Sequence, residues 1–133
     1  MMTIKSSKTQ VEEAMKQIDT INASEVLKMS NDGKCTLIDI RDIRELWNEG
    51  GIEKAIHIPR GMLEFWLDPV SPYYKKEKYE DKNKKIILFC AGGMRSALAT
   101  KTLKDMGYEN IAHIEGGFAA MRDSGFNIVD KKD

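Results

Sequence analysis

The sequence predicts an α/β domain with a parallel sheet, and three observations support this fold class. Short apolar runs rich in β-branched residues alternate with segments whose apolar residues recur at helical spacing. Glycines and other turn residues separate these segments, and 133 residues suffice for one domain. Strands that alternate with helices imply parallel pairing, because a helix is the usual crossover between parallel strands.

The expected elements follow in chain order. A first helix is capped by Ser7 or Thr9, and a second opens at Asn22 or Ser24 after an extended stretch at Ile21. Further strands are expected over 35–40, 55–58, 86–89 and 111–114, and further helices over 43–47, 61–67, 96–106 and 118–122. The lysine-rich segment 75–85 is interpreted as a solvated loop. We expect an N-terminal extension over 1–20, a domain over 21–128 and a polar tail over 129–133.

Composition excludes several classes of protein. Hydrophobic residues make up 41% and charged residues 32%, which is too apolar for a disordered chain and too polar for a membrane protein. Lys plus Arg (21) equals Asp plus Glu (21), and this balance argues against a nucleic-acid partner. The lack of a long apolar stretch argues against a membrane partner. The start of the chain lacks a continuous apolar run, and two cysteines make no disulfide scaffold, so we expect a cytoplasmic protein.

The strongest functional signal is Cys90, which directly follows the most apolar expected strand. Gly92 and Gly93 let the backbone N–H groups of the next turn point inward, and the expected helix begins at about Ser96. The positive end of that helix, together with Arg95, favours a cysteine thiolate. Sites in parallel sheets form beyond the carboxyl ends of strands, so Cys90 is predicted to be catalytic.

The other reactive side chains are interpreted as structural. Cys35 opens a strand without glycines around it, so we expect a packed, inert thiol. His57 and His113 lie between isoleucines within strands, and no third ligand has useful spacing, so we expect neither a metal nor any other cofactor. The apolar segment 62–67 has three interpretations: it covers the sheet, shields the mouth of the site or forms a dimer contact.

Four motifs in order resemble the rhodanese-like sulfurtransferases, and specifically their single-domain members. They are Leu37-Ile38-Asp39-Ile40-Arg41-Asp42, Ala55-Ile56-His57-Ile58-Pro59, Cys90-Ala91-Gly92-Gly93-Met94-Arg95-Ser96 and Glu115-Gly116-Gly117-Phe118. The resemblance covers roughly 21–126 and implies a five-stranded parallel sheet flanked by helices on both faces. It also implies that Cys90 takes a sulfane sulfur, stores it as a persulfide and passes it to a nucleophile.

The resemblance also assigns roles around Cys90. Residues 91–96 (Ala91, Gly92, Gly93, Met94, Arg95 and Ser96) form the loop that binds the persulfide. Asp39 is implied to pair with Arg95 and fix the loop, and Arg41 and Arg60 are candidates for the mouth. The implied partners are thiosulfate or a persulfide as donor and a thiol or cyanide as acceptor, with a sulfur-relay protein as a further candidate.

This chain departs from the family pattern at two places. Gly50-Gly51-Ile52-Glu53-Lys54-Ala55 stands where the family usually has Gly-His-Ile-Pro-Gly-Ala, which we expect to loosen that turn. The loop carries a single cation, Arg95, where thiosulfate-using members have more. Thiosulfate is therefore expected to bind weakly, and a persulfide to be the better donor.

Alternative functions remain open. One is a non-catalytic module with the same fold that binds a partner or carries sulfur, although inactive members typically lack the cysteine. A cysteine phosphatase or arsenate reductase is disfavoured, because cysteine phosphatases place five residues between cysteine and arginine. Here only four residues separate Cys90 from Arg95. A Cys-X-X-Cys redox enzyme is excluded because the chain has no such pair.

Overall fold

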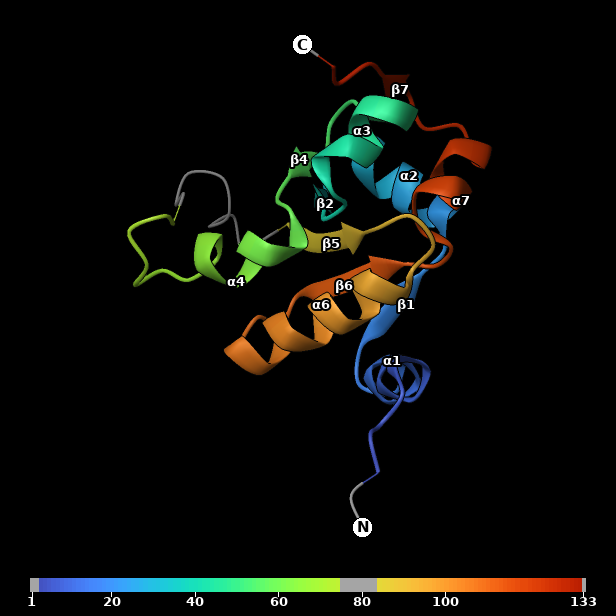
Figure 1. Cartoon of the computed structure of the whole chain (residues 1–133). Helices are drawn as coiled ribbons and strands as arrows, with labels where there is room; N and C mark the ends of the chain where they lie inside the picture. Colours follow the sequence, from blue (N-terminus) through green and yellow to red (C-terminus); the bar gives the residue numbers. More distant parts are fainter. Residues whose placement is uncertain (1–2, 75–83, 133) are drawn as a thin grey trace.

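A computed structural model describes residues 3–74 and 84–132, and it has the predicted α/β architecture. Five strands form one parallel sheet in the order β1-β6-β5-β2-β4 (Figure 1). They are β1 (Asp19–Ile21), β2 (Cys35–Asp39), β4 (Ile56–His57), β5 (Lys85–Phe89) and β6 (Ile111–Ile114). The central position of β5 explains its almost uninterrupted apolar sequence, because both of its faces are covered.

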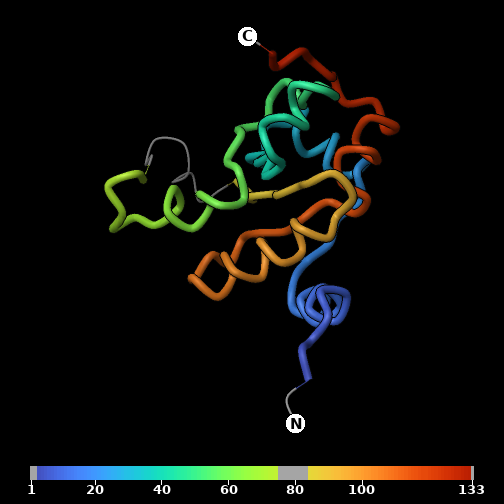
Figure 2. Tube along the Cα trace, viewed as in Figure 1, coloured from blue at the N-terminus to red at the C-terminus, as the bar shows by residue number. Residues whose placement is uncertain are grey.

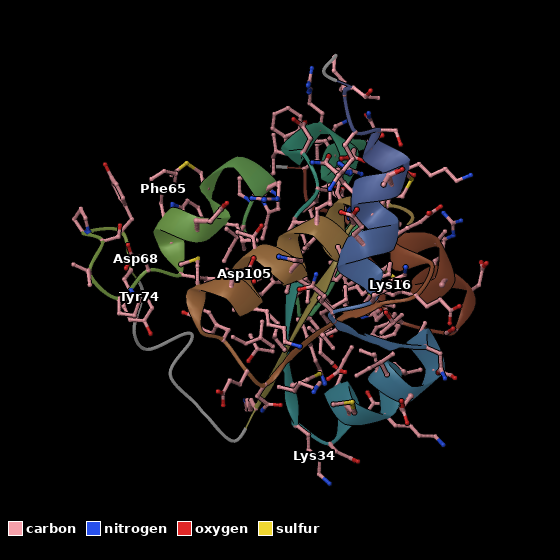
Figure 3. All side chains as sticks on the ribbon, turned by 90° about the horizontal axis from the view of Figure 1, so that it is seen from below. Lys16, Lys34, Phe65, Asp68, Tyr74 and Asp105 are labelled. Carbon is pink, nitrogen blue, oxygen red and sulfur yellow. The ribbon has the colours of Figure 1, made fainter. Side chains whose placement is uncertain are left out.

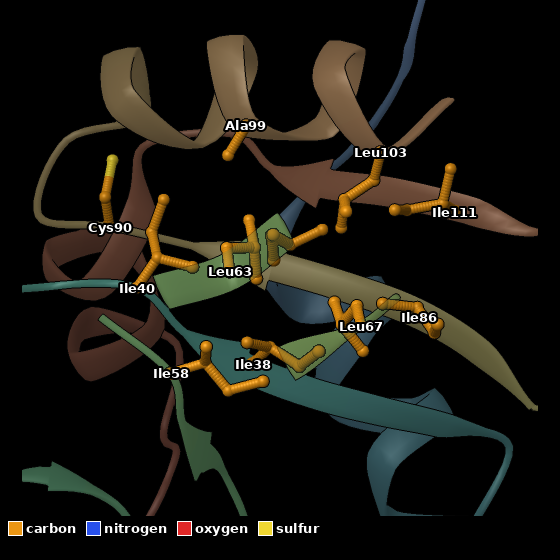
Figure 4. Packing of buried hydrophobic residues seen from close by; sticks show 11 residues of the cluster. Ile38, Ile40, Ile58, Leu63, Leu67, Ile86, Cys90, Ala99, Leu103 and Ile111 are labelled. Carbon is orange, nitrogen blue, oxygen red and sulfur yellow. The ribbon is translucent and has the colours of Figure 1, made fainter. Parts of the chain in front are cut away.

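Helices cover both faces of this sheet, as the family resemblance implied (Figure 1). The helices are α1 (Ser7–Met15), α2 (Ala23–Asn31), α3 (Ile43–Glu49), α4 (Leu63–Trp66), α6 (Met94–Met106) and α7 (Gly117–Asp123), with a 3₁₀ turn η1 (Arg60–Met62). Alternate residues of each strand enter opposite cores, so Leu88 packs with α4 and α6 while Phe89 packs with α2 and α7. Figure 4 shows the first core, with Cys90 beneath the start of α6 and Ile40 beside it.

Local capping explains where the helices begin. Ser6 caps α1 and accepts a hydrogen bond from the Thr9 N–H, so the expected caps Ser7 and Thr9 are wrong. Asn22 caps α2, one of the two expected residues. Asp42 caps α3 in a capping box with Glu45. The helix expected from Ser96 begins two residues earlier, at Met94, because Gly93 adopts φ +109° and serves as its cap.

A second, two-stranded sheet was not expected from the sequence. β3 (Gly51–Ile52) pairs antiparallel with β7 (Ile128–Val129), which joins the segment after α3 to the C-terminal segment. The Glu53 N–H also donates to the Asn127 carbonyl at 3.1 Å, and the Asn127 amide donates to the Glu53 carboxylate at 2.9 Å. The segment expected to form a loose turn is therefore held by the C-terminal chain.

The segment after β4 covers the edge of the first core. Leu63 and Leu67 are fully buried against the α6 side of the sheet, which confirms the interpretation that this segment covers the sheet. Phe65, between them, is 56% exposed and lies on the outer side of the segment (Figure 3). The trace of residues 60–74 extends away from the sheet (Figure 2). The lysine-rich segment interpreted as a loop lies mostly outside the described residues.

Within the described residues, the helices are too short or too polar to cross a membrane.

Candidate functional site

Cys90 lies where the sequence placed it, at the carboxyl end of the central strand. It follows Phe89, the last residue of β5, and its side chain is 1% exposed at the end of the first core. Two backbone N–H groups point at its sulfur: Gly93 N lies 3.1 Å and Ser96 N lies 3.4 Å from Sγ. The loop is therefore a cradle of amides around one sulfur atom, an arrangement that stabilises negative charge.

The loop holds this shape because α7 binds its outer side. The Phe118 N–H donates to the Cys90 carbonyl at 2.8 Å, and the Ala119 N–H donates to the Ala91 carbonyl at 3.4 Å. Since these carbonyls point toward α7, the amides of the following residues are free to face Sγ. Gly117, at φ +57°, makes this close approach possible, because a Cβ there would overlap the Cys90 carbonyl oxygen.

Arg95 does not pair with Asp39, so that expectation from the family resemblance is wrong. Its guanidinium forms two hydrogen bonds with the Glu45 carboxylate, at 2.9 and 3.0 Å. The hydrogen bond to Glu45 is the main cause that raises the pKa of Arg95, and the Cys90 sulfur raises it further. The same bond, opposed by burial, lowers the pKa of Glu45. The loop's single cation is thus already paired.

Glu45 is a site residue that the sequence analysis missed. It accepts a hydrogen bond from the Asp42 N–H at 2.9 Å, which fixes its carboxylate at the start of α3 beside the loop. The spacing Asp42-x-x-Glu45, typical of a capping box, was the available signal for its orientation.

Asp39 instead pairs with Arg41, two residues later on the same strand end. Arg41 Nη2 lies 2.8 Å from the Asp39 carboxylate and 2.9 Å from the Gly50 carbonyl, and its Cζ lies 4.0 Å from the centre of the Phe118 ring. Arg41 is fully buried, so the expectation that it lines the mouth is wrong. It connects β2, the segment before β3 and α7.

Arg60 lies at the same edge of the sheet but is also paired. Its backbone N–H donates to the Ile40 carbonyl at 3.1 Å, which places it next to the end of β2. Its guanidinium donates to Glu64 at 2.7 Å, and its side chain is 35% exposed. The structure thus brings Arg60 to the rim without a direct contact to Cys90.

A row of polar side chains runs from Cys90 across the sheet. Ser96 Oγ lies 3.6 Å from Cys90 Sγ and 2.9 Å from His113 Nδ1. His113 Nε2 lies 3.0 Å from Thr20 Oγ1 on the edge strand β1. Burial lowers the pKa of His113 to about 4. His113 is therefore a hydrogen-bonded strand histidine, as predicted, but its connection to Cys90 was not foreseen.

The second cysteine, Cys35, lies at the opposite end of the sheet. It opens β2, where its partner in the register is Lys85, and burial raises the pKa of its thiol. A pocket of about 370 Å³ beside it is lined partly by Ser30, Lys54 and Lys84. A thiol with a raised pKa at the amino end of the strands is poorly placed for nucleophilic chemistry, so this pocket does not displace Cys90 as the site.

The described residues contain no group of three His, Cys, Asp or Glu side chains suited to a metal ion.

Comparison with known proteins identifies the family. The sequence model of one protein family, the rhodanese-like domain, matches residues 22–124 of this chain. The chain belongs to the rhodanese-like family. Its solved relatives include a polysulfide-sulfur transferase homodimer from Wolinella succinogenes, which is 30% identical, with a TM-score of 0.72 over 94% of this chain and 88% of that one.

A second solved structure is similar over almost its full length. A Rhodopseudomonas palustris protein of unknown function, named as a possible tyrosine phosphatase, is 43% identical with a TM-score of 0.87. The match covers 97% of this rhodanese-like chain and 98% of that protein.

Curated relatives are longer proteins. The tRNA uridine(34) hydroxylase of Erwinia tasmaniensis is 34% identical over an alignment of 101 residues, and the match covers 73% of this chain. This rhodanese-like chain spans about a quarter of the length of the curated relatives it matches (26% for that hydroxylase).

The contact between Gly117 and the Cys90 loop generates a prediction about stability. Gly117→Ala should lower the free energy of unfolding by at least about 2 kcal/mol, because strain at positive φ adds to overlap with the loop carbonyls. Urea unfolding measures the change. Gly33→Ala is the matched control, since Gly33 has φ +69° and open space around a Cβ, and it should cost only about 1 kcal/mol. Equal losses in the two variants would show that the loop contact is unimportant.

Burial of His113 predicts a loss of stability in mild acid. Its pKa falls from 6.5 to about 4 on folding, so the unfolded chain takes up the proton first. This group leaves stability unchanged above its unfolded pKa, and stability is lost progressively as the pH falls toward the folded value. The expected loss between about pH 7 and about pH 5 is at most about 2 kcal/mol. Urea unfolding should show that the free energy of unfolding depends less on pH in His113→Asn than in the unmodified protein. The same pH dependence in both proteins would contradict the lowered pKa of His113 as the cause.

Proposed function

We propose that this protein is a sulfurtransferase that carries a sulfane sulfur on Cys90 as a persulfide. The observation that carries the proposal is the amide cradle around one sulfur, with Gly93 N at 3.1 Å and Ser96 N at 3.4 Å from Sγ. The Cys90 thiolate attacks the outer sulfur of the donor, and the bond between the two donor sulfurs breaks. A persulfide donor then leaves as a thiolate, or thiosulfate leaves as sulfite. A thiol or cyanide takes the outer sulfur and restores the Cys90 thiolate.

Space at the loop supports this chemistry. A Cβ on Gly92 would meet no atom within 4 Å, so there is open space at Gly92, two residues after the cysteine. The amides that face Sγ are fixed before the reaction, so they stabilise developing negative charge without reorganisation.

The charge of the loop favours a persulfide donor over thiosulfate. Arg95 is bound at two points by Glu45, so little positive charge is left to hold a sulfonate. The Met94 side chain, 56% exposed, adds no charge to the loop. The similar Wolinella succinogenes protein is a polysulfide-sulfur transferase. A polysulfide, like a persulfide, delivers its outer sulfur without a sulfonate, which agrees with a neutral loop.

Phosphatase activity is the second candidate, because the similar Rhodopseudomonas palustris protein is named as a possible tyrosine phosphatase. A phosphate carries three charged oxygens that need many donors and a free cation. This loop has four residues between Cys90 and Arg95, and Arg95 is paired with Glu45. The shorter loop and the paired arginine favour a single sulfur atom over a phosphate.

The proposed function predicts that the transferred sulfur is carried on Cys90 and not on Cys35. Incubation with a small-thiol persulfide should add one sulfur atom, which peptide mass mapping should find on Cys90. Cys90→Ser should lose this addition, and Cys35→Ser should retain it as the matched control. Sulfur on Cys35 alone, or its retention in Cys90→Ser, would contradict the proposal. If the chain without substitutions gains no sulfur but still binds a partner, that result would favour the non-catalytic module.

A further prediction concerns the charge of the Cys90 loop. Glu45→Gln should raise kcat/KM for thiosulfate about tenfold, because a freed guanidinium donates charge-assisted hydrogen bonds to the sulfonate. Gln is suited to the capping box, so α3 should stay intact. Met94→Lys should give a similar gain by adding a cation. The measurement compares thiosulfate with a small-thiol persulfide, whose use should change little.

Glu49→Gln is the control for the loop-charge prediction. It removes the same charge from the same helix, and its ion pair is with Arg41 at 3.9 Å and not with Arg95, so the use of thiosulfate should not change. If thiosulfate is the better substrate of the unmodified protein, or if neither Glu45→Gln nor Met94→Lys alters its use, the loop-charge explanation is wrong. Hydrolysis of an aryl phosphate by the unmodified protein would instead support the phosphatase.

A further inference from the structure

We infer that Ser96, His113 and Thr20 form a proton path that carries the thiol proton of Cys90 to the edge strand β1. The links are 3.6 Å from Cys90 Sγ to Ser96 Oγ, 2.9 Å from Ser96 Oγ to His113 Nδ1, and 3.0 Å from His113 Nε2 to Thr20 Oγ1. This inference rests on the proposed function, since it assigns the deprotonation that sulfur transfer requires. It adds Ser96 from α6, His113 from β6 and Thr20 from β1 to the site.

The position of Cys90 creates the need for such a path. The thiolate is the nucleophile, so the thiol must lose its proton before it attacks a donor. Cys90 is only 1% exposed, so most of the surface of its side chain, including the side that faces Ser96, lies inside the protein. Ser96 is fully buried beside it, whereas Thr20 at the far end of the row is exposed. The row thus connects a buried thiol to solvent on another part of the surface.

A proton path requires a histidine that can carry its proton on either ring nitrogen, and the two histidines of this chain differ in this respect. His57 Nε2 lies 2.7 Å from the Arg41 carbonyl, which only accepts, so this nitrogen must carry the proton. His113 has a hydroxyl group at each nitrogen, and a hydroxyl both donates and accepts. Either neutral tautomer of His113 is therefore satisfied, whereas the hydrogen bond of His57 fixes one tautomer.

The proton moves by a reversal of every hydrogen bond in the row. Before the step, Cys90 S–H donates to Ser96, Ser96 O–H donates to His113 Nδ1, and His113 Nε2–H donates to Thr20. In the step, each group passes its proton to the next one, and Thr20 releases its own proton to water. Afterwards Thr20 donates to Nε2, Nδ1–H donates to Ser96, and Ser96 donates to the thiolate. One proton leaves Cys90, one reaches water, and no other group changes charge.

His113 stays neutral during this step, in keeping with the lowered pKa that burial gives it. The charged groups at the Cys90 end are Arg95, whose pKa the Cys90 sulfur helps to raise, and its partner Glu45. At the other end, Asp19 precedes Thr20, is exposed and lies 3.9 Å from Lys85. The first ion pair lies at the Cys90 end of the row, and the second involves the residue that precedes Thr20. The buried middle, Ser96 and His113, is uncharged.

Nitrogen NMR of the histidine rings tests the path without any sulfur donor. The full chain with Cys35→Ser is labelled at histidine, and the chain has only two histidines. Alkylation of Cys90 by iodoacetamide follows its ionisation in parallel samples at the same pH values. We expect His113 to carry its proton on Nε2 when Cys90 is a thiol and on Nδ1 when it is a thiolate. His57 should stay protonated on Nε2 throughout, as an internal reference.

Two results would overturn the inference: a His113 tautomer that stays unchanged while Cys90 ionises, or the same switch in Cys90→Ala. Because neither measurement uses a donor, a switch without sulfur transfer would support the path and reject the proposed function. Sulfur transfer with a fixed tautomer would support the function and reject the path.

Discussion

The hydrogen bonds between the first turn of α7 and the carbonyls of the Cys90 loop fix the geometry of the site. Phe118 N and Ala119 N hold the carbonyls of Cys90 and Ala91 on the outer side, so the later amides of the loop face the sulfur. The sheet alone would not achieve this, because β5 ends at Phe89 and the loop that follows has no strand partner. Gly117 is required because any larger residue would separate α7 from the loop.

Pairing of the arginines sets the charge of the site. Arg41 is fully buried beside Asp39 and against Phe118, so it stabilises the position of α7 and leaves no charge at the mouth. A buried pair of this kind contributes little net stability, but loss of either partner leaves a costly buried charge. Arg95 is held by Glu45 in turn. Three elements, β2, α3 and α7, thus fix both cations, and the remaining polar lining of Cys90 is uncharged.

The sequence predicted what depends on local pattern and failed where long-range contacts decide. Strand and helix positions, the placement of Cys90 and the capping role of Asn22 follow from spacing within a few residues. The β3–β7 pair joins segments about 75 residues apart, and its two-residue strands carry almost no pattern. The partner of Arg95 depends on the orientation of α3, which the spacing of residues does not reveal. For that reason the implied Asp39–Arg95 pair was wrong.

Long-range contacts also decide the function inferred for His113, which the local sequence pattern did not reveal. As one polar residue within a buried strand, it was correctly interpreted as a hydrogen-bonded core histidine. Its link to Cys90 arises from the parallel register, which places Thr20 opposite His113, and from α6, which places Ser96 over the same face. A buried polar group must find partners, and here its partners are two hydroxyls that accept either tautomer. The structural requirement to satisfy His113 therefore also yields a continuous hydrogen-bonded row from the nucleophile to the edge of the sheet.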